Sequence, residues 1–298
     1  MDLRLLELFC HVYKARSFSR AARDLGLSQP TVSAHIKDLE EQLGGPVFNR
    51  LGREIEPTEA GRLLYEQARS LLTLKRNVID RMAQFLDRIE GDLVVGASTV
   101  PGEYLLPGLL ATFHAAHPGV RARLRVSDTA AAIDDLRDGE IQLAMVGGTA
   151  PDEDLVFEPF ARDRLVLVVP ARRPWTARRE ISLRQLAELP LLVRESGSGT
   201  RKVLQEALAQ RDLELPALRI VAELGSTSAI KEAVKQGHGV SFVSALAIAS
   251  ERTAGLLHVL RVRELGPVRR TYYTALDRRR ALSPVSRAFR EYLASRRH

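Results

Sequence analysis

Residues 17–61, SFSRAARDLGLSQPTVSAHIKDLEEQLGGPVFNRLGREIEPTEAG, decide the fold of the N-terminal part of this 298-residue chain. Ser17 is a suitable N-cap for a short helix, and Gly26 can end that helix in a left-handed conformation. The apolar stripe of this helix consists of Phe18, Ala21, Ala22 and Leu25. Ser28 then caps a second helix with Pro30 in its first turn, where no backbone N–H is needed. The stretch therefore predicts two helices joined by a tight, glycine-containing turn.

The second of these helices has one apolar and one polar face. Its inward residues follow steps of four, three and four: Val32, Ile36, Leu39 and Leu43. The outward residues are small or polar near the start of the helix: Pro30, Ser33, Ala34 and Lys37. A helix-turn-helix that enters the major groove of DNA needs such a face, because bulky side chains would prevent close approach. An ordinary three-helix bundle is the alternative.

A helix precedes this stretch, and a two-stranded wing closes it. Apolar residues with helical spacing predict a first helix that ends near Ala15: Leu5, Leu6, Phe9, Cys10, Val12 and Tyr13. Short apolar segments around Val47 and Ile55 flank Arg50 and Arg53. A wing that carries two arginines is suited to phosphates or to a minor groove.

A long helix is predicted from Thr58 to about Ile89, because this span has no proline and no glycine after Gly61. At 1.5 Å per residue it would be roughly 48 Å long. One narrow apolar stripe runs along it: Leu64, Ala68, Leu71, Val78, Met82, Phe85 and Ile89. The stripe indicates a partner helix in a dimer, and the alternative is a helix that lies on its own domain.

Composition excludes several classes of protein. The apolar fraction of 45% and the charged fraction of 27% predict folded domains rather than disorder. The net charge is +7, but residues 1–60 carry 8 Lys and Arg against 9 Asp and Glu, so basicity alone does not indicate DNA binding. No apolar run approaches a membrane span, and the N-terminus lacks a secretory cleavage site, so we expect a cytoplasmic protein without a membrane partner. The single cysteine, Cys10, excludes an intrachain disulfide and a multi-cysteine metal site.

From Gly91 onward, short β-branched runs alternate with helical stretches. The runs are LVVG, RARLRV, QLAMVGG, RLVLVVP, PLLV, RIVAE, GVSFV and TYYTAL. This alternation predicts a mostly parallel α/β sheet, and the last helix is expected to begin at Ser283 and Pro284.

Two strand-to-helix turns in this region are rich in hydroxyl groups. The first contains Ser98, Thr99 and Val100, and the second contains Ser196, Ser198 and Thr200. Hydroxyls and free N–H groups at helix starts can hold an anion without a buried counter-charge, although simple helix capping is the alternative for each turn. Glu195 would repel an anion, so we expect it to point away or to pair with Arg194 or Arg201. A third turn, Gly225 to Ser228, is expected only to cap its helix.

Catalytic motifs do not fit the chain. The sequence contains no G-x-S-x-G elbow, Walker loop or H-E-x-x-H motif. His114 and His117 lack an acidic or cysteine companion nearby in the sequence, so no metal site is expected there. We therefore expect neither an enzyme nor a cofactor, and a solute-binding or enzymatic module without a DNA role is the alternative.

The stretch 17–61 resembles the N-terminal signature of the LysR-type transcriptional regulators along about 45 consecutive residues. The matching positions are Ala21, Ala22, Leu27 to Pro30, Val32, Ser33, Leu39, Glu40, Leu43, Gly44, Phe48, Arg50, Thr58, Ala60 and Gly61. The resemblance and the wing together imply DNA contacts at Ser28, Gln29, Pro30, Thr31, Ser33, Lys37, Arg50 and Arg53.

The resemblance also implies the domain organisation and the partners. A winged helix-turn-helix domain would span 1–57, a linker and dimerisation helix 58–90, and a periplasmic-binding-protein-like effector domain 91–298. In that α/β domain, lobe 1 would contain about 91–162 and 268–298, and lobe 2 about 163–267. Dimers, assembling further into tetramers, would form through Leu64, Leu71, Val78, Met82 and Phe85. The implied partners are double-stranded DNA with inverted repeats and, as a further candidate, RNA polymerase.

Within the family, three segments are most similar to regulators of sulfur and selenium metabolism: GASTVPGEYLLP, RESGSGTR and ELGSTSAIKEAVKQG. This resemblance implies an effector that is a small oxyanion or a sulfur or selenium metabolite. It would be bound between the lobes by Ser98, Thr99, Val100, Ser196, Ser198 and Thr200. A larger organic acid is the alternative.

Overall fold

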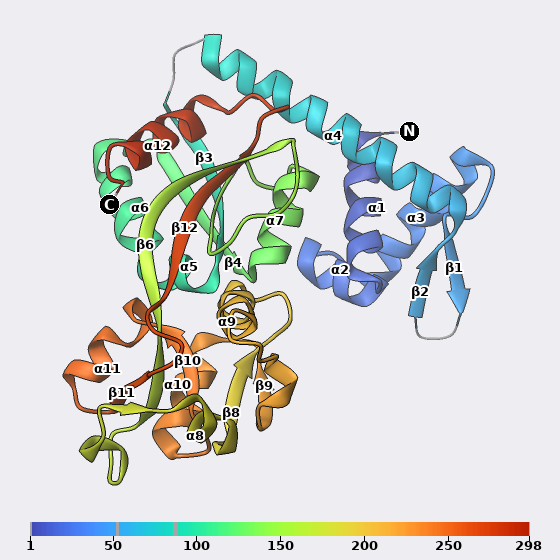
Figure 1. Cartoon of the computed structure of the whole chain (residues 1–298). Helices are drawn as coiled ribbons and strands as arrows, with labels where there is room; N and C mark the ends of the chain where they lie inside the picture. Colours follow the sequence, from blue (N-terminus) through green and yellow to red (C-terminus); the bar gives the residue numbers. More distant parts are fainter. Residues whose placement is uncertain (1, 52–53, 86–88, 298) are drawn as a thin grey trace. The chain divides into compact units, whose positions relative to one another are not determined.

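The computed structural model describes residues 2–51, 54–85 and 89–297, which form two compact units (Figure 1). The N-terminal unit is Met1–Phe85 and the C-terminal unit is Leu86–His298. The N-terminal unit contains α1 (Leu3–Ala15), α2 (Phe18–Leu25), α3 (Gln29–Leu43), β1 (Phe48–Leu51), β2 (Glu54–Pro57) and α4 (Glu59–Phe85). The three predicted N-terminal helices and the two-stranded wing are therefore confirmed.

The predicted caps explain where these helices begin and end. The Ser17 hydroxyl accepts a hydrogen bond from the backbone N–H of Arg20, and the Ser28 hydroxyl accepts one from Thr31. Gly26 ends α2 in the left-handed region with φ +66°, where other residues are strained. Apolar side chains of α1 to α4 and the wing form one core, which includes Phe9, Val12, Ala21, Val32, Ile36, Leu39, Phe48 and Ala68.

Gly61 lets α4 begin directly against the base of the wing. A Cβ atom at this position would lie 2.1 Å from the backbone oxygen of Val47. Thr58 holds the same junction, since its hydroxyl donates to the Pro46 carbonyl at 2.9 Å and accepts from the Gly61 N–H at 3.0 Å. The small residue and the hydroxyl therefore fix the direction in which α4 leaves the wing.

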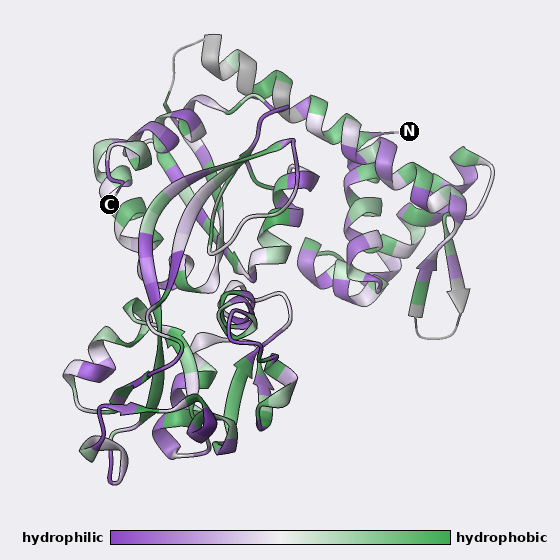
Figure 2. Ribbon diagram, viewed as in Figure 1, coloured by the Kyte–Doolittle hydropathy of each residue, from purple (hydrophilic) through white to green (hydrophobic). Residues whose placement is uncertain are grey.

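Only the first half of the long helix packs against its own unit. In the first half of α4, Ala68 and Leu72 are buried in the core of their own unit, and Leu64 packs against them. In the second half, the described stripe residues are exposed, with Val78 at 54% and Met82 at 55%. Figure 2 shows hydrophobic positions interspersed with hydrophilic ones along α4. The side chain of Phe85 lies outside the described residues. The described helix runs to Phe85, residues 86–88 lie outside the described residues, and Ile89 has no regular structure.

The C-terminal unit consists of alternating strands and helices, as predicted. Its elements are β3 (Gly91–Ser98), α5 (Thr99–Tyr104), α6 (Leu106–Ala116), β4 (Val120–Ser127), α7 (Thr129–Asp138), β5 (Leu143–Val146), β6 (Leu155–Pro170), η1 (Trp175–Ala177), β7 (Glu180–Ile181), α8 (Leu183–Glu188), β8 (Leu191–Arg194), α9 (Gly199–Ala209), η2 (Leu215–Ala217), β9 (Ile220–Leu224), α10 (Thr227–Gln236), β10 (Ser241–Ser244), η3 (Leu246–Ile248), α11 (Ala249–Thr253), β11 (Leu257–Val262), β12 (Val268–Asp277) and α12 (Pro284–Ala294). The cap of α12 is also as predicted, because the Ser283 hydroxyl accepts from the Ser286 N–H at 3.2 Å.

The sheet is mixed, which corrects the prediction of a mostly parallel one. Parallel pairs occur within each lobe, as between β3 and β4 and between β8 and β9. However, β6 pairs antiparallel with β10, β11 and β12, and β12 pairs antiparallel with β5. The reason is that the 16-residue strand β6 runs through both lobes, and β12 returns beside it (Figure 1). Alternation of strands and helices did not reveal this return.

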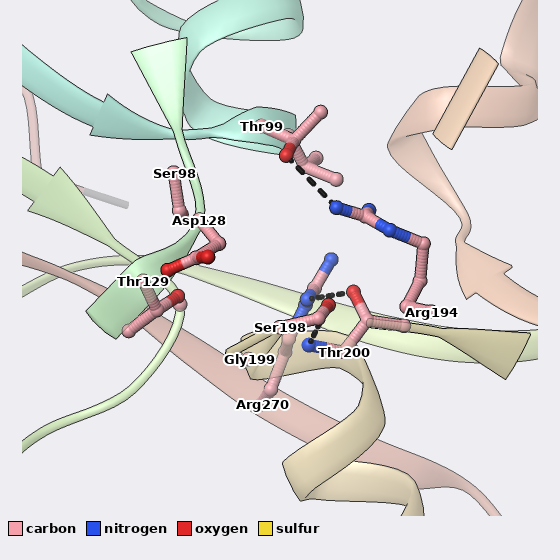
Figure 3. A pocket seen from close by; sticks show the side chains of 11 residues that line it. Ser98, Thr99, Asp128, Thr129, Arg194, Ser198, Gly199, Thr200 and Arg270 are labelled. Carbon is pink, nitrogen blue, oxygen red and sulfur yellow. Dashed lines mark hydrogen bonds between the residues drawn. The ribbon is translucent and has the colours of Figure 1, made fainter. Parts of the chain in front are cut away.

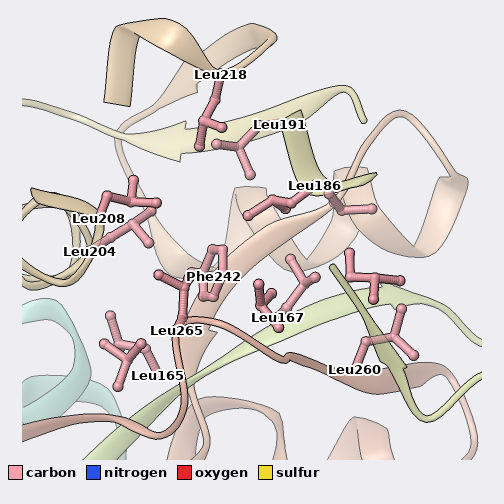
Figure 4. Close-up of a cluster of buried hydrophobic side chains, with 14 of the residues drawn as sticks. Leu165, Leu167, Leu186, Leu191, Leu204, Leu208, Leu218, Phe242, Leu260 and Leu265 are labelled. Atoms are coloured by element: carbon pink, nitrogen blue, oxygen red, sulfur yellow. The ribbon is translucent and has the colours of Figure 1, made fainter. Parts of the chain in front are cut away.

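Separate apolar cores define the two lobes. Lobe 1 contains clusters around Leu93, Phe113 and Phe289 and around Ile133 and Val146. Lobe 2 contains a large cluster between its strands and helices α8 and α9, which includes Leu167, Leu191, Leu204, Phe242 and Leu260 (Figure 4). Among the described residues, none of the helices combines the length and apolar character that crossing a membrane requires.

Candidate functional site

Helix α3 presents the polar face that the sequence predicts. Val32, Ile36 and Leu39 are fully buried, while Ser28, Gln29 and Pro30 are exposed and Thr31 and Ser33 are partly exposed. The fourth residue predicted to face inward, Leu43 in the last turn, is 44% exposed, so that part of the prediction is wrong. The side-chain amide of Gln29 donates to the Ser33 hydroxyl at 3.2 Å, and the hydroxyls of Ser28 and Thr31 lie 2.7 Å apart. These weak local contacts at the surface leave the polar groups accessible to a partner.

Lys37 completes the described part of this surface, and Glu40 holds α3 against the wing. The ammonium group of Lys37 lies 3.6 Å from the Glu41 carboxylate, and both side chains are well exposed. Glu40 connects α3 to the wing, because its carboxylate accepts from the Val47 N–H at 2.9 Å. The side chain of Arg50 and the whole of Arg53 lie outside the described residues.

A small cavity lies between the two lobes of the C-terminal unit, and we call it the interlobe cavity (Figure 3). Its volume is about 10 Å³, which is about the space of one water molecule. The lining residues come from both lobes and from β12: Ser98, Thr99, Val100, Asp128, Thr129, Gly147, Arg194, Ser198, Gly199, Thr200 and Arg270. The cavity thus joins the first predicted turn to part of the second.

Arg194 is the first of two buried cations at this cavity, with only 4% of its surface exposed. Its guanidinium donates to both carboxylate oxygens of Glu195, at 2.7 and 2.6 Å, and to the Thr227 hydroxyl at 2.8 Å. A fourth hydrogen bond, of 3.1 Å, reaches Thr99 in the other lobe. The expected pairing of Glu195 with Arg194 is confirmed, and this pairing turns the carboxylate into a support for the guanidinium.

Arg270 is the second buried cation, and it lies on β12 where the chain passes between the lobes. Its side chain is 3% exposed, and its Nε donates to the Asp163 carboxylate at 2.8 Å. One Nη donates to the Thr200 hydroxyl at 3.0 Å, and the other donates to the Tyr272 hydroxyl. Burial raises the pKa of Tyr272 well above its usual range, so this phenol stays neutral and donates to Asp163 at 2.8 Å.

Several hydroxyl groups complete the interlobe cavity. Ser98 is buried at the start of α5 but makes no capping hydrogen bond, whereas the Ser198 hydroxyl accepts from the Thr200 N–H at 3.2 Å. The hydroxyl of Thr129 is buried and has no hydrogen-bond partner among the described residues. A buried hydroxyl without a partner costs free energy, so Thr129 marks a position where a ligand atom would be favourable.

Two glycines allow the lobes to approach this closely. A Cβ atom on Gly199 would lie 2.8 Å from the Thr129 hydroxyl, and one on Gly197 would lie 2.6 Å from the Asp128 carboxylate. A second contact between the lobes lies outside the cavity, where the Lys231 ammonium donates to the Tyr104 hydroxyl at 2.9 Å. Burial lowers the pKa of Lys231, but hydrogen bonds to Glu251 and Tyr104 outweigh this effect and raise it, so the ammonium stays charged.

The structure brings most of the predicted effector residues together. Ser98, Thr99, Val100, Ser198 and Thr200 line the interlobe cavity, whereas Ser196 is exposed and does not line it. The third turn does more than cap its helix: Ser226 caps α10, and Thr227 holds Arg194.

Sequence reasoning missed both buried arginines and the Asp128 and Thr129 turn. The idea of a site without buried cations is therefore wrong. Two signals were present: Arg194 ends the apolar strand LLV, and Arg270 shares its alternation phase with Val268 and Tyr272, which are buried. No group of three or more His, Cys, Asp or Glu side chains that could hold a metal occurs among the described residues.

Comparisons with known proteins agree on the family. A family model described as "LysR substrate binding domain" matches residues 87–297, and "Bacterial regulatory helix-turn-helix protein, lysR family" matches residues 3–62. The chain is 36% identical to a probable RuBisCO transcriptional regulator of Synechocystis over 92% of this chain and 80% of the relative.

Two solved structures support the same fold. The regulatory domain of CcmR from Synechocystis PCC6803, in complex with 2-PG, is 29% identical, with a TM-score of 0.63, and the match covers 69% of this chain and 97% of that one. CbnR, a LysR family transcriptional regulator, matches over the full length of both chains with a TM-score of 0.70 and 21% identity, which shows the fold alone.

The relatives named here do not support the narrower resemblance to sulfur and selenium regulators, because they are described as transcriptional regulators of RuBisCO. The one from Allochromatium vinosum is 33% identical over 99% of this chain and 96% of the relative. The two family models together cover nearly the whole chain. This chain therefore belongs to the LysR family of DNA-binding transcriptional regulators, with an effector-binding domain.

Proposed function

We propose that this regulator binds inverted-repeat DNA as a dimer and that a small anion in the interlobe cavity controls that binding. Helix α3 enters the major groove with Ser28, Gln29, Pro30, Thr31, Ser33 and Lys37, while Arg50 and Arg53 of the wing contact the DNA backbone. The exposed polar face of α3 supports this assignment. Higher assembly and contact with RNA polymerase belong to the same proposal.

The effector is a compact anion with an oxyanion group, of the chemical kind that 2-PG represents. One observation carries this proposal: two buried guanidinium groups and hydroxyls of both lobes surround one small cavity. Guanidinium groups bind phosphate and carboxylate with charge-assisted hydrogen bonds. The 2-PG complex of the CcmR regulatory domain favours such an anion over a sulfur or selenium metabolite. A larger organic acid is the alternative, and it would require more widely separated lobes.

The direct contacts between the lobes suggest how the effector acts. With a volume of about 10 Å³, the interlobe cavity holds an anion only after the lobes have moved apart. An anion that enters takes over the hydrogen bond that Arg194 donates to Thr99 across the cleft. It also supplies the partner of the Thr129 hydroxyl. The effector then shifts the population between two lobe arrangements and, through the dimer, the bend of the DNA.

Calorimetry on the full chain tests the effector. We expect 2-PG to bind, and we expect Thr129→Val, which keeps the shape but removes the hydroxyl, to weaken binding about fivefold to tenfold, the scale of one hydrogen bond. Ser98→Ala combined with Thr200→Ala should abolish binding. Thr274→Val is the control, because Thr274 is equally buried but does not line the cavity.

The competing effectors belong to the same experiment. Sulfate, thiosulfate and selenite are the competing small anions. If the wild-type chain binds none of these compounds but binds a large neutral or aromatic metabolite, the small-anion proposal is wrong.

Light scattering tests the dimer. The second half of the predicted stripe, described at Leu71, Val78 and Met82, is exposed and follows helical spacing. Val78→Asp combined with Met82→Asp would place unpaired charge in a dimer seam, so we expect monomers at micromolar concentration. Arg62→Asp is the control, since Arg62 is exposed on the same helix away from the stripe. An unchanged oligomer in the double variant would mean that the stripe is not the interface.

A further inference from the structure

A second pocket lies in lobe 2, where β11 stops pairing with β6 and β12 begins to pair with it. Strand β11 pairs with β6 as far as Leu260 opposite Leu167, and β12 resumes on the same edge with Val268 opposite Leu165. Between these two pairs, the chain covers eight residues from Leu260 to Val268, whereas β6 covers only two, from Leu167 to Leu165. The intervening segment leaves the sheet as a loop, and the space beside it is what we call the β11–β12 pocket.

This pocket has the size and lining of a site for a small organic molecule. Its volume is about 610 Å³, within the usual range for ligand pockets, and it shares no lining residue with the interlobe cavity. Most of its wall is apolar: Leu165, Val166, Leu167, Phe242, Val259, Leu260, Val262, Leu265, Pro267 and Val268. Several of these side chains belong to the large cluster of lobe 2 (Figure 4).

The loop that encloses the pocket is held in place by its neighbours. The Glu264 carboxylate accepts from the Leu183 N–H at 2.8 Å, and the Glu264 carbonyl accepts from the Arg211 side chain at 2.7 Å. Leu265 is buried in the lobe 2 core, and the Arg263 N–H donates to the Ile181 carbonyl at 3.0 Å. Because the loop is anchored at several points, the pocket is preformed rather than a product of a loose segment.

The charged residues of the pocket are strongly biased toward cations. Arg164, Arg261 and Arg263 line it together with one acid, Glu180, which Arg261 and Arg263 share at 3.3 and 3.2 Å. Arg164 is exposed and makes no side-chain hydrogen bond or ion pair with the described residues. Its cross-strand neighbour is Arg269, so two like charges lie opposite each other, an arrangement that an anion would relieve.

We infer that the β11–β12 pocket binds an organic acid with an apolar body and one carboxylate. The apolar wall takes the body, and Arg164 with the paired arginines at the rim takes the carboxylate. The site is separate from the interlobe cavity and independent of the effector proposed above. Since Leu165 and Val268 belong to the two strands that pass between the lobes, an occupant would contact the segments that connect the lobes.

Octanoate is the probe for this site, and 8-anilinonaphthalene-1-sulfonate, an anion with an aromatic body, is the reporter. We expect the reporter to become fluorescent with the full-length chain and to be displaced by octanoate but not by octyltrimethylammonium. Arg164→Gln should weaken octanoate about fivefold, the scale of one exposed ion pair. Val259→Phe, which fills the pocket from a partly buried position, should abolish displacement.

Two controls distinguish this site from nonspecific charge attraction and from the interlobe cavity. Arg252→Gln removes an exposed arginine outside the pocket lining and should leave octanoate binding unchanged. Thr129→Val, in the interlobe cavity, should also leave it unchanged, so failure of one site does not imply failure of the other. Equal displacement by the anion and the cation, or octanoate binding that survives Val259→Phe in a folded variant, would overturn the inference.

Discussion

The two units of the chain treat buried polar groups in opposite ways. Every described residue that is polar or charged and also buried belongs to the C-terminal unit, beginning with Ser98. The described core of the N-terminal unit is apolar throughout, and its ion pair between Lys75 and Glu7 is exposed. In the N-terminal unit, the polar side chains of α3 lie at the surface. In the C-terminal unit, the buried cations Arg194 and Arg270 are already paired with carboxylates. Stability should therefore depend on buried charge in one unit and on close packing in the other.

Removing one partner of the buried ion pair should have the largest effect. Asp163→Ala leaves Arg270 buried without its carboxylate, and both side chains are no more than 3% exposed. We expect the C-terminal unit to lose about 3–5 kcal/mol of unfolding free energy. Trp175, the only tryptophan, lies in this unit, so its fluorescence during urea denaturation follows this unit alone.

Glu180→Ala is the matched control, because it breaks exposed pairs with Arg261 and Arg263 in the same unit. Its expected cost is about 1 kcal/mol or less. Equal losses in the two variants would contradict a special dependence on buried charge.

Close packing in the N-terminal unit is tested at Gly61. Gly61→Ala would force a Cβ atom against the Val47 backbone oxygen, 2.1 Å away, and neither backbone can yield easily. We expect a loss of about 3 kcal/mol, at the upper end for overpacking. Circular dichroism measures it, while the Trp175 transition should not move. Gly45→Ala is the control, since a Cβ there meets no atom within 4 Å; a similar loss at Gly45 would show that general glycine effects are responsible.

The surface of α3 should respond in binding rather than in stability. Gln29→Ala is expected to cost about 2 kcal/mol of affinity for a preferred DNA site and to relax the base preference. Lys37→Ala should weaken all sequences and reduce the salt dependence by about one phosphate contact. Fluorescence anisotropy against sites selected with the wild-type chain measures both. Unchanged affinity in both variants would remove these residues from the DNA interface.

The smallest expected effect is a dependence on pH at Asp277. Burial raises the pKa of this carboxyl, but hydrogen bonds from Arg279 and Arg280 outweigh burial and leave it below its ordinary value of 3.8. The folded state therefore binds the proton more weakly than the unfolded state, so this contribution is present above about pH 4 and is lost as the pH falls through the lowered pKa. The urea midpoint of the Trp175 transition should fall from pH 5 to pH 3, and it should fall less in Asp277→Asn. An equal fall in both would assign the effect to other groups.

Local patterns were sufficient for the N-terminal unit and insufficient for the interlobe cavity. The caps at Ser17 and Ser28 and the glycine turn at Gly26 act within a few residues, so the sequence predicts them directly. The cavity joins residues from Ser98 to Arg270, and only the folded β6 and β12 bring them together. Arg270 in particular looked like one of many arginines, because its partner Asp163 lies 107 positions away in the chain.

The long pairing of β6 with β12 also limits how the two lobes can move. Ten register pairs join the strands from Leu165 to Leu155, with one bulge between Tyr272 and Tyr273. Two separate linkers would permit sliding, but sliding one paired strand along the other would break the whole ladder of backbone hydrogen bonds. Bending costs least at the bulge, where the ladder is already interrupted. We therefore expect any lobe motion to be a rotation about one axis near Tyr272. Because Arg270 lies close to that axis, a small displacement of Arg270 would correspond to a larger displacement at the ends of the lobes.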